Sequence, residues 1–145
     1  MYNIIICEDY KIERDELKEN LTKIFNNLDE KISIQEYSSG EELLDDLNNV
    51  KKSDIIFLDI IMKKISGIDV AIFLREKNIM TKIIFLTAMP NFLNESYFIE
   101  YNTYLLKPIN YEFLNEIISK LVKENFANKN DYIVVWCKNQ NLTIP

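Results

Sequence analysis

Histidine is absent from this chain of 145 residues. Its absence excludes Ser-His-Asp and Cys-His nucleophile systems, histidine metal sites, and a phosphohistidine carried by the chain itself. Cysteine is scarce as well, because Cys7 and Cys137 lie far apart and neither belongs to a C-x-x-C pair. Neither a disulfide framework nor a thiol-metal site is therefore indicated, and the cysteine usage fits a reducing cytoplasm.

Positive charge is also in deficit. The chain has 17 Lys and Arg against 23 Asp and Glu, a net charge of −6. This is the wrong sign for a domain that neutralises nucleic-acid phosphates, so any DNA contact would need a part that is not present here. Long apolar runs are lacking too: the strongest, residues 55–62, is too short to span a bilayer and is broken by Asp59. Without a basic leader before the first apolar run, we expect an unexported, cytoplasmic protein with no membrane contact.

What is present is enough apolar material for one compact core. Hydrophobic residues make up 48% of the chain and aromatic residues 12%, and the length fits one domain of ordinary size. Short apolar runs predict strands, and apolar positions spaced by three and four residues predict amphipathic helices. The predicted strands are residues 4–7, 32–37, 55–58, 82–86 and 104–106.

Five helices are predicted to alternate with these strands. They are residues 11–27; a helix that starts at a capping box of Ser39 and Glu42 and runs through Leu47; a short one through Val70, Ala71, Phe73 and Leu74, after a loop closed by Gly67; residues 90–100; and one capped by Asn110 that runs through Phe113, Ile117, Leu121 and Val122. The alternation predicts an α/β fold: a five-stranded parallel sheet, doubly wound in the flavodoxin-like (βα)5 manner, with helices on both faces. Residues 125–131 are predicted to be a linker, and residues 132–136 one more strand with no partner left in the sequence.

Polar side chains follow four of the predicted strands. Glu8 and Asp9 follow the first, Asp59 the third, Thr87 the fourth and Lys107 the fifth. The functional crevice of an open parallel sheet lies outside the carboxyl ends of its strands. We therefore expect three carboxylates, one hydroxyl and one ammonium group to converge there.

Clustered carboxylates are unfavourable unless a cation neutralises them, and hard oxygen ligands suit Mg²⁺. Glu8, Asp9 and Asp59 are therefore predicted to form a Mg²⁺ site. A carboxylate oxygen of Asp59 could then attack a phosphoryl group and form an aspartyl phosphate. In this scheme Mg²⁺, Thr87 and Lys107 hold the charge on the phosphoryl oxygens.

This constellation resembles the CheY-like receiver domain of bacterial two-component response regulators, over about residues 1–126. The motifs that carry the resemblance are Glu8-Asp9 after the first strand, Asp59 in the sequence Phe57-Leu58-Asp59-Ile60-Ile61-Met62, Gly67 eight residues further on, Thr87-Ala88, and Lys107-Pro108. The resemblance implies that Asp59 is the phosphoacceptor for a sensor histidine kinase and that the domain catalyses its own phosphorylation and slow dephosphorylation. It also implies that the backbone carbonyl of Ile61 is a further Mg²⁺ ligand, and that the Lys107-Pro108 peptide bond is cis.

The resemblance further assigns a switch. Thr87 and Tyr104 would report phosphorylation, and the signal would appear on the face of the fourth helix, fifth strand and fifth helix, which many members use to form homodimers. Lys63 stands where the family often has proline, and Ile61 and Met89 occupy positions that tune phosphate loss. These departures bear on the lifetime of the phosphate.

Residues 132–145 resemble the opening strand of a LytTR-type DNA-binding domain. By this analogy, residues 127–145 are a linker and the start of a truncated output domain, and the chain comes from a transcription regulator.

Three other classes of protein share parts of this pattern. A haloacid-dehalogenase-type phosphohydrolase wants its nucleophile after the first strand and a second Asp two residues on, but the position two residues after Asp59 is Ile61. A flavodoxin-like cofactor binder needs a Ser/Thr/Gly-rich phosphate loop where Glu8, Asp9 and Tyr10 stand. A phosphate-independent docking module remains the third alternative. Taken singly, each polar residue could be an ordinary turn or surface residue.

Overall fold

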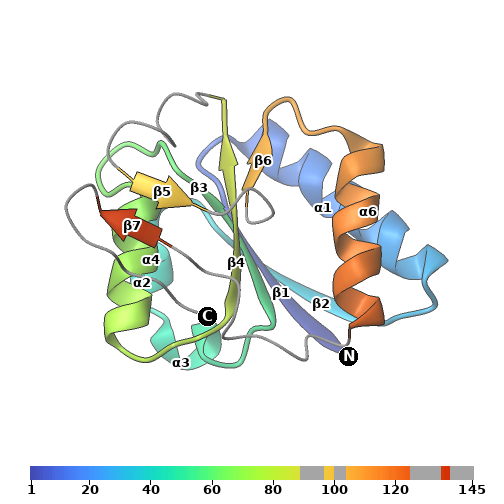
Figure 1. Cartoon of the computed structure of the whole chain (residues 1–145), viewed down its shortest axis with the longest axis horizontal. Coiled ribbons are helices and arrows are strands. Elements are labelled where there is room, and N and C mark those ends of the chain that lie inside the picture. The colour runs from blue at the N-terminus through green and yellow to red at the C-terminus, as the bar shows by residue number, and fades with distance from the viewer. Residues whose placement is uncertain (89–96, 100–103, 125–134, 138–145) are drawn as a thin grey trace.

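A single parallel sheet organises the fold (Figure 1). The computed structural model of the chain describes residues 1–88, 97–99, 104–124 and 135–137. Its five strands pair in parallel in the order β2-β1-β3-β4-β6, which confirms the predicted fold class. These strands are β1 (Tyr2–Cys7), β2 (Ile32–Tyr37), β3 (Ile55–Asp59), β4 (Lys82–Thr87) and β6 (Tyr104–Leu106).

Helices cover both faces of the sheet. They are α1 (Lys11–Asn27), α2 (Gly40–Leu44), α3 (Leu47–Val50), α4 (Gly67–Glu76) and α6 (Tyr111–Lys123). In Figure 1, α1 and α6 lie on one face and α2, α3 and α4 on the other. The sheet therefore separates two apolar clusters, one that includes Phe25 and Phe57 and another that includes Leu58 and Phe85. Because both faces are covered, β3 and β4 are buried along their whole length, which explains the four consecutive apolar residues in each strand, residues 55–58 and 83–86.

Side-chain caps fix where three helices begin. Ser39 Oγ accepts a hydrogen bond from Glu42 N at 3.1 Å, Ser66 Oγ accepts one from Asp69 N at 3.1 Å, and Asn110 Oδ1 accepts one from Phe113 N at 2.8 Å. The predicted caps at Ser39 and Asn110 are confirmed. The Glu42 carboxylate, however, accepts from Ser38 N and not from Ser39 N, so the capping box is only half formed.

The predicted second helix is broken into α2 and α3. Asp46, between them, has non-helical backbone angles of φ −126° and ψ 41°. Its carboxylate accepts hydrogen bonds from Tyr37 Oη at 2.6 Å and from Asn49 Nδ2 at 3.0 Å. The bond to Tyr37 ties this position to the end of β2, and the chain turns there in place of continuing as a helix.

The predicted helix over residues 90–100 is wrong where the structure describes it. Tyr97–Ile99 is a strand, β5, paired antiparallel with β7 (Val135–Cys137). Two aromatic residues and a β-branched residue in succession favour a strand, and the apolar stripe of the expected helix was weak. Residues 135–136 of the final strand predicted over residues 132–136 lie in β7, and residues 132–134 lie outside the described residues. The expectation that this strand has no partner is wrong, because β5 pairs with β7. The rest of the predicted helix and the predicted linker lie outside the described residues.

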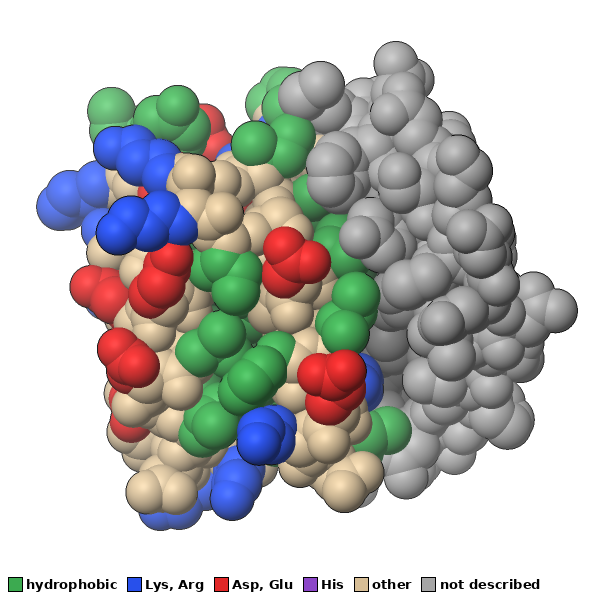
Figure 2. Space-filling model, turned by 90° about the vertical axis from the view of Figure 1, so that its left-hand side faces the viewer, with side chains coloured by type: hydrophobic (Ala, Val, Ile, Leu, Met, Phe, Trp, Pro, Cys, Tyr) green, Lys and Arg blue, Asp and Glu red, His purple; other side chains and the backbone are tan. Residues whose placement is uncertain are grey.

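The surface on the side of α2 and α4 has a patch of apolar side chains at its centre. Figure 2 looks at this side and shows apolar side chains gathered between acidic and basic ones. Half-buried apolar side chains pack from here against the core: Leu44, Leu47, Met62, Ile65 and Ile72.

Within the described ranges, none of the helices combines the length and apolar character needed to cross a membrane.

Gly67 holds the loop after β3 against the end of that strand. Its N–H donates to Ile60 O at 2.8 Å, and a Cβ atom at this position would lie 2.2 Å from Asp59 O. The closeness of backbone to backbone, and not an unusual φ, is what requires glycine here. The loop that follows Asp59 therefore depends on this contact.

We expect Gly67→Ala to lower the free energy of unfolding by about 1–3 kcal/mol, because the new methyl group can fit only if the backbone of Asp59 moves. Urea denaturation measures the change. Gly40→Ala is the matched control: Gly40 also follows a serine cap at a helix start, but its Cβ would meet side-chain methyl groups of Ile65 and Val70. Equal costs for the two variants would contradict the role given to the Asp59 backbone.

Candidate functional site

The polar residues predicted from the strand ends do converge. Glu8 and Asp9 directly follow β1, Asp59 and Thr87 are the last residues of β3 and β4, and Lys107 directly follows β6. These positions all lie at the carboxyl ends of the strands, at the top of Figure 1. The parallel register places them there, since β1 pairs with β3, β3 with β4 and β4 with β6.

Three carboxylates form the centre of the site. Glu8 and Asp59 are 1% and 3% exposed, and Asp9 is half-buried. One oxygen from each of the three lies within 4.8 Å of the others. Asp9 Oδ1 is buried and has no hydrogen-bond partner among the described residues. A buried, unpartnered carboxylate oxygen beside two further carboxylates is the donor set that a hard divalent cation such as Mg²⁺ requires.

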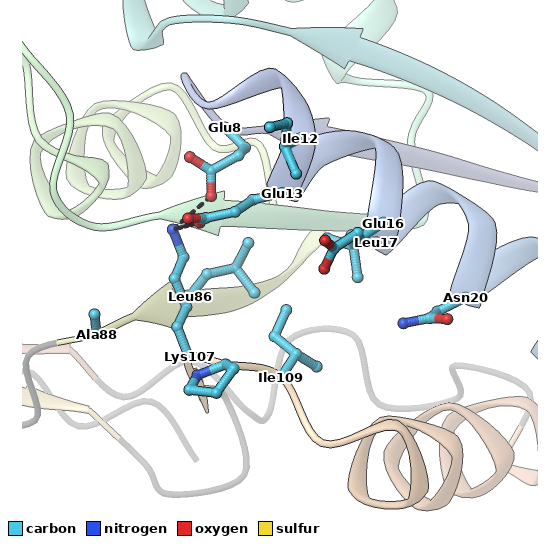
Figure 3. Close-up of a pocket in the computed structure, with 11 residues that line it drawn as sticks. Glu8, Ile12, Glu13, Glu16, Leu17, Asn20, Leu86, Ala88, Lys107 and Ile109 are labelled. Atoms are coloured by element: carbon cyan, nitrogen blue, oxygen red, sulfur yellow. Dashed lines mark hydrogen bonds and ion pairs between the residues drawn. The ribbon is translucent and has the colours of Figure 1, made fainter.

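Lys107 neutralises part of this charge (Figure 3). Its Nζ lies 2.5 Å from Glu8 Oε1, 2.6 Å from Glu13 Oε1 and 3.4 Å from Asp59 Oδ2. A second anchor acts on the backbone, because Lys107 N donates to Thr87 O at 2.8 Å. The ammonium group therefore reaches carboxylates at the ends of β1 and β3 from the end of β6, which lies beyond β4 at the edge of the sheet.

Burial governs the proton affinity of the cluster. It raises the pKa of Glu8 to about 8, against the opposing effect of the hydrogen bond to Lys107. It also raises the pKa of Asp59, although the Lys107 charge works in the other direction. For Lys107, burial acts to lower the pKa, but the hydrogen bonds to Glu13 and Glu8 outweigh it and raise the pKa above its ordinary value. All three raised pKa values favour the protonated form of the group, so the cluster favours added positive charge.

Glu13 and Arg14 belong to this site and were missed from the sequence. Glu13 lies in the first turn of α1 and pairs with Lys107. Arg14 Nη1 donates to Glu8 O at 2.6 Å, which fixes the backbone at the end of β1. The only sequence signal was their place one turn after Glu8-Asp9, because Lys107, the partner of Glu13, lies more than ninety residues away in the sequence.

The predicted switch residues occupy different surroundings. Thr87 is fully buried, whereas Tyr104 is half-buried and packs against the core cluster on the α2–α4 face. The Lys107-Pro108 peptide bond is cis, as the resemblance implies. Ile61 is exposed, and its ligand role remains a prediction. Met89 lies outside the described residues.

A groove of about 510 Å³ opens beside Lys107, between α1 and the segment that follows β6. Apolar side chains form part of its lining, and Glu8, Glu13 and Lys107 stand at the end nearest the carboxylate cluster (Figure 3). The residues that line it are Glu8, Ile12, Glu13, Glu16, Leu17, Asn20, Leu86, Ala88, Lys107, Pro108 and Ile109.

A doubly wound parallel sheet with an acidic cluster and a lysine at its strand ends defines a CheY-like domain. Residues 4–119 match the family model for the response regulator receiver domain. The chain belongs to this family, and it is a receiver domain of two-component signal transduction. The match supports the receiver interpretation over the phosphohydrolase and cofactor-binding alternatives.

The chain is also similar to curated regulatory and sensory transduction proteins. The chain is 32% identical over 124 residues to a positive alginate biosynthesis regulatory protein of Pseudomonas aeruginosa, covering 85% of this chain and 48% of that protein. It is 33% identical over 129 residues to the sensory transduction protein LytR of Staphylococcus haemolyticus, covering 88% and 47%. The chain therefore spans about half the length of the curated relatives it matches.

Solved structures agree on the fold. The response regulator TrrA of Thermotoga maritima, in complex with Mg²⁺ and BeF, superposes with a TM-score of 0.66 at 30% identity, covering 83% of this chain and 99% of that one. The chemotaxis protein CheY4 of Vibrio cholerae superposes with a TM-score of 0.64 at 20% identity, covering 83% and 98%.

We expect Asp59→Asn to raise the free energy of unfolding by about 1 kcal/mol at neutral pH in the presence of a chelator. The substitution removes a buried carboxyl group whose ionised form the fold disfavours. Urea denaturation with EDTA measures this. Asp15→Asn is the control, because the ion pair that the structure gives Asp15 is an exposed one with Lys11 and its loss should change stability little. A loss of stability in Asp59→Asn would show that the charge is compensated.

Proposed function

We propose that this receiver domain accepts a phosphoryl group on Asp59 from the phosphohistidine of a sensor histidine kinase. An oxygen of the Asp59 carboxylate bonds to phosphorus, the bond from phosphorus to the imidazole nitrogen breaks, and the imidazole takes up a proton. The convergence of Glu8, Asp9 and Lys107 around the buried Asp59 carboxylate is the observation that carries this proposal.

Mg²⁺ is the cofactor that we assign to this step. Glu8, Asp9 and Asp59 would hold it, with the carbonyl of Ile61 as a further ligand. Asp9 Oδ1 supports this assignment, because it is buried and no residue in the described part of the chain bonds to it. When bound, Mg²⁺ supplies positive charge to the phosphoryl oxygens. Thr87, at the end of the neighbouring strand β4, adds a hydroxyl, and Lys107, which follows β6, adds an ammonium group. The domain thereby catalyses its own phosphorylation and slow dephosphorylation.

The outward signal is proposed to pass through β6. Thr87 and Tyr104 would respond to the phosphate. The surface of β6 and α6 beside Tyr104 would then be the contact surface of a homodimer. Leu106 and Phe113 support this location, because both are large apolar side chains that are more than 40% exposed. They share a hollow of about 530 Å³ with Tyr104, between β6 and α6.

The output is proposed to be a LytTR-type DNA-binding domain for transcription regulation. In this arrangement residues 1–126 are the receiver, and residues 127–145 are the linker and the start of the output domain. Support comes from relatives named LytR and LytT and from their greater length. The net charge of −6 fits a regulatory half that leaves DNA contact to another part.

The first experiment is intact mass spectrometry after incubation with acetyl phosphate. We expect one added phosphoryl group that requires both Mg²⁺ and Asp59, with Asp59→Asn as the control. If no adduct forms and Mg²⁺ with beryllofluoride does not bind either, the chain is a phosphate-independent docking module.

A second prediction concerns the cation. We expect Mg²⁺ to raise the unfolding temperature of the chain, and Asp9→Asn to weaken Mg²⁺ binding by about tenfold or more, because it removes a charged ligand. Thermal unfolding at increasing Mg²⁺ concentration measures both effects. Asp15→Asn should bind Mg²⁺ like the unmodified chain, and an Asp9→Asn variant that does the same would remove Asp9 from the site.

A further inference from the structure

The Lys107 ammonium is shared among carboxylates that differ in kind. Glu8 and Asp59 are buried and belong to the cluster assigned to the cation. Glu13 is outside that cluster, and its side chain is 46% exposed. Yet Glu13 Oε1 lies 2.6 Å from Lys107 Nζ, closer than the 3.4 Å that separates this nitrogen from the proposed phosphoacceptor.

The fold fixes the position of Glu13 opposite Lys107. Glu13 sits in the first turn of α1, whose buried Leu17 and Leu21 anchor the helix to the sheet. From there its carboxylate reaches Lys107 across the inner end of the groove (Figure 3). Glu8 approaches the same ammonium group from the end of β1.

We propose that Glu13 is a positioning residue that holds Lys107 back from Asp59 and slows phosphorylation. The inference rests on the proposed function, in which Lys107 must bind the phosphoryl oxygens. A nitrogen paired with Glu13 is less available to those oxygens, so the pair has to loosen before Lys107 can serve the incoming group. The Glu13 charge also repels a phosphoryl anion that enters beside it.

The test compares Glu13→Gln with a matched variant, Glu16→Gln. Glu16 lies one turn further along the exposed face of α1, and forms no ion pair with any residue that the structure describes. Both variants lose one negative charge on the same helix, but only the first removes a partner that draws Lys107 away from Asp59. Initial rates with acetyl phosphate at saturating Mg²⁺ are followed on the full chain by intact mass.

We expect Glu13→Gln to be phosphorylated about two- to fivefold faster than the unmodified chain, the range that a partly exposed ion pair supports. Glu16→Gln should match the unmodified chain, and Glu13→Asp should restore much of the restraint. The dissociation constant for beryllofluoride at saturating Mg²⁺ should fall by a similar factor in Glu13→Gln, which a merely structural role would not produce.

The outcomes separate this inference from the proposed function. If the unmodified chain is phosphorylated on Asp59 but Glu13→Gln is no faster than Glu16→Gln, or is slower, the restraint does not exist and the phosphoacceptor assignment stands. If the unmodified chain accepts no phosphoryl group and binds no beryllofluoride, the proposed function itself fails.

Discussion

The ion pairs of Lys107 are the interaction on which this site depends. One ammonium group stands against three carboxylates, and its bond to Glu8 joins residues 99 positions apart in the chain. Those residues follow β1 and β6, which are separated in the sheet by β3 and β4. The site therefore exists only when β1, β3, β4 and β6 are paired, because no local segment contains both the acids and their counter-charge.

Burying carboxylates opposes folding, so the rest of the molecule has to compensate for it. The raised pKa values of Glu8 and Asp59 reflect this cost. The compensation lies below the site, where β3 and β4 are buried from end to end between two apolar clusters. Because the apolar core supplies the stability, the strand ends can hold a charge arrangement suited to a cation and a phosphoryl group.

The sequence predicted what local patterns determine and failed where distant contacts decide. The central strands, α1 and α6 follow from apolar runs and helical spacing, and the five polar residues follow from their places after those strands. The break between α2 and α3 depends on Tyr37 reaching Asp46, and the strand at Tyr97–Ile99 on pairing with β7. Neither partner is adjacent in the chain. Glu13 was missed for the same reason, because its partner Lys107 is identified only by the folded sheet.

β6 connects the charge cluster to the outer surface over a very short distance. It has only three residues: Leu105 is buried in the core, while Leu106 is exposed and Tyr104 is half-buried against the core. Lys107 follows at once, with its backbone N–H bound to Thr87 O. If the ammonium group moves toward a phosphoryl group on Asp59, the displacement acts directly on this strand. A change at the carboxylates can therefore reach Leu106 and Phe113 without rearrangement of β3 or β4, whose burial resists movement.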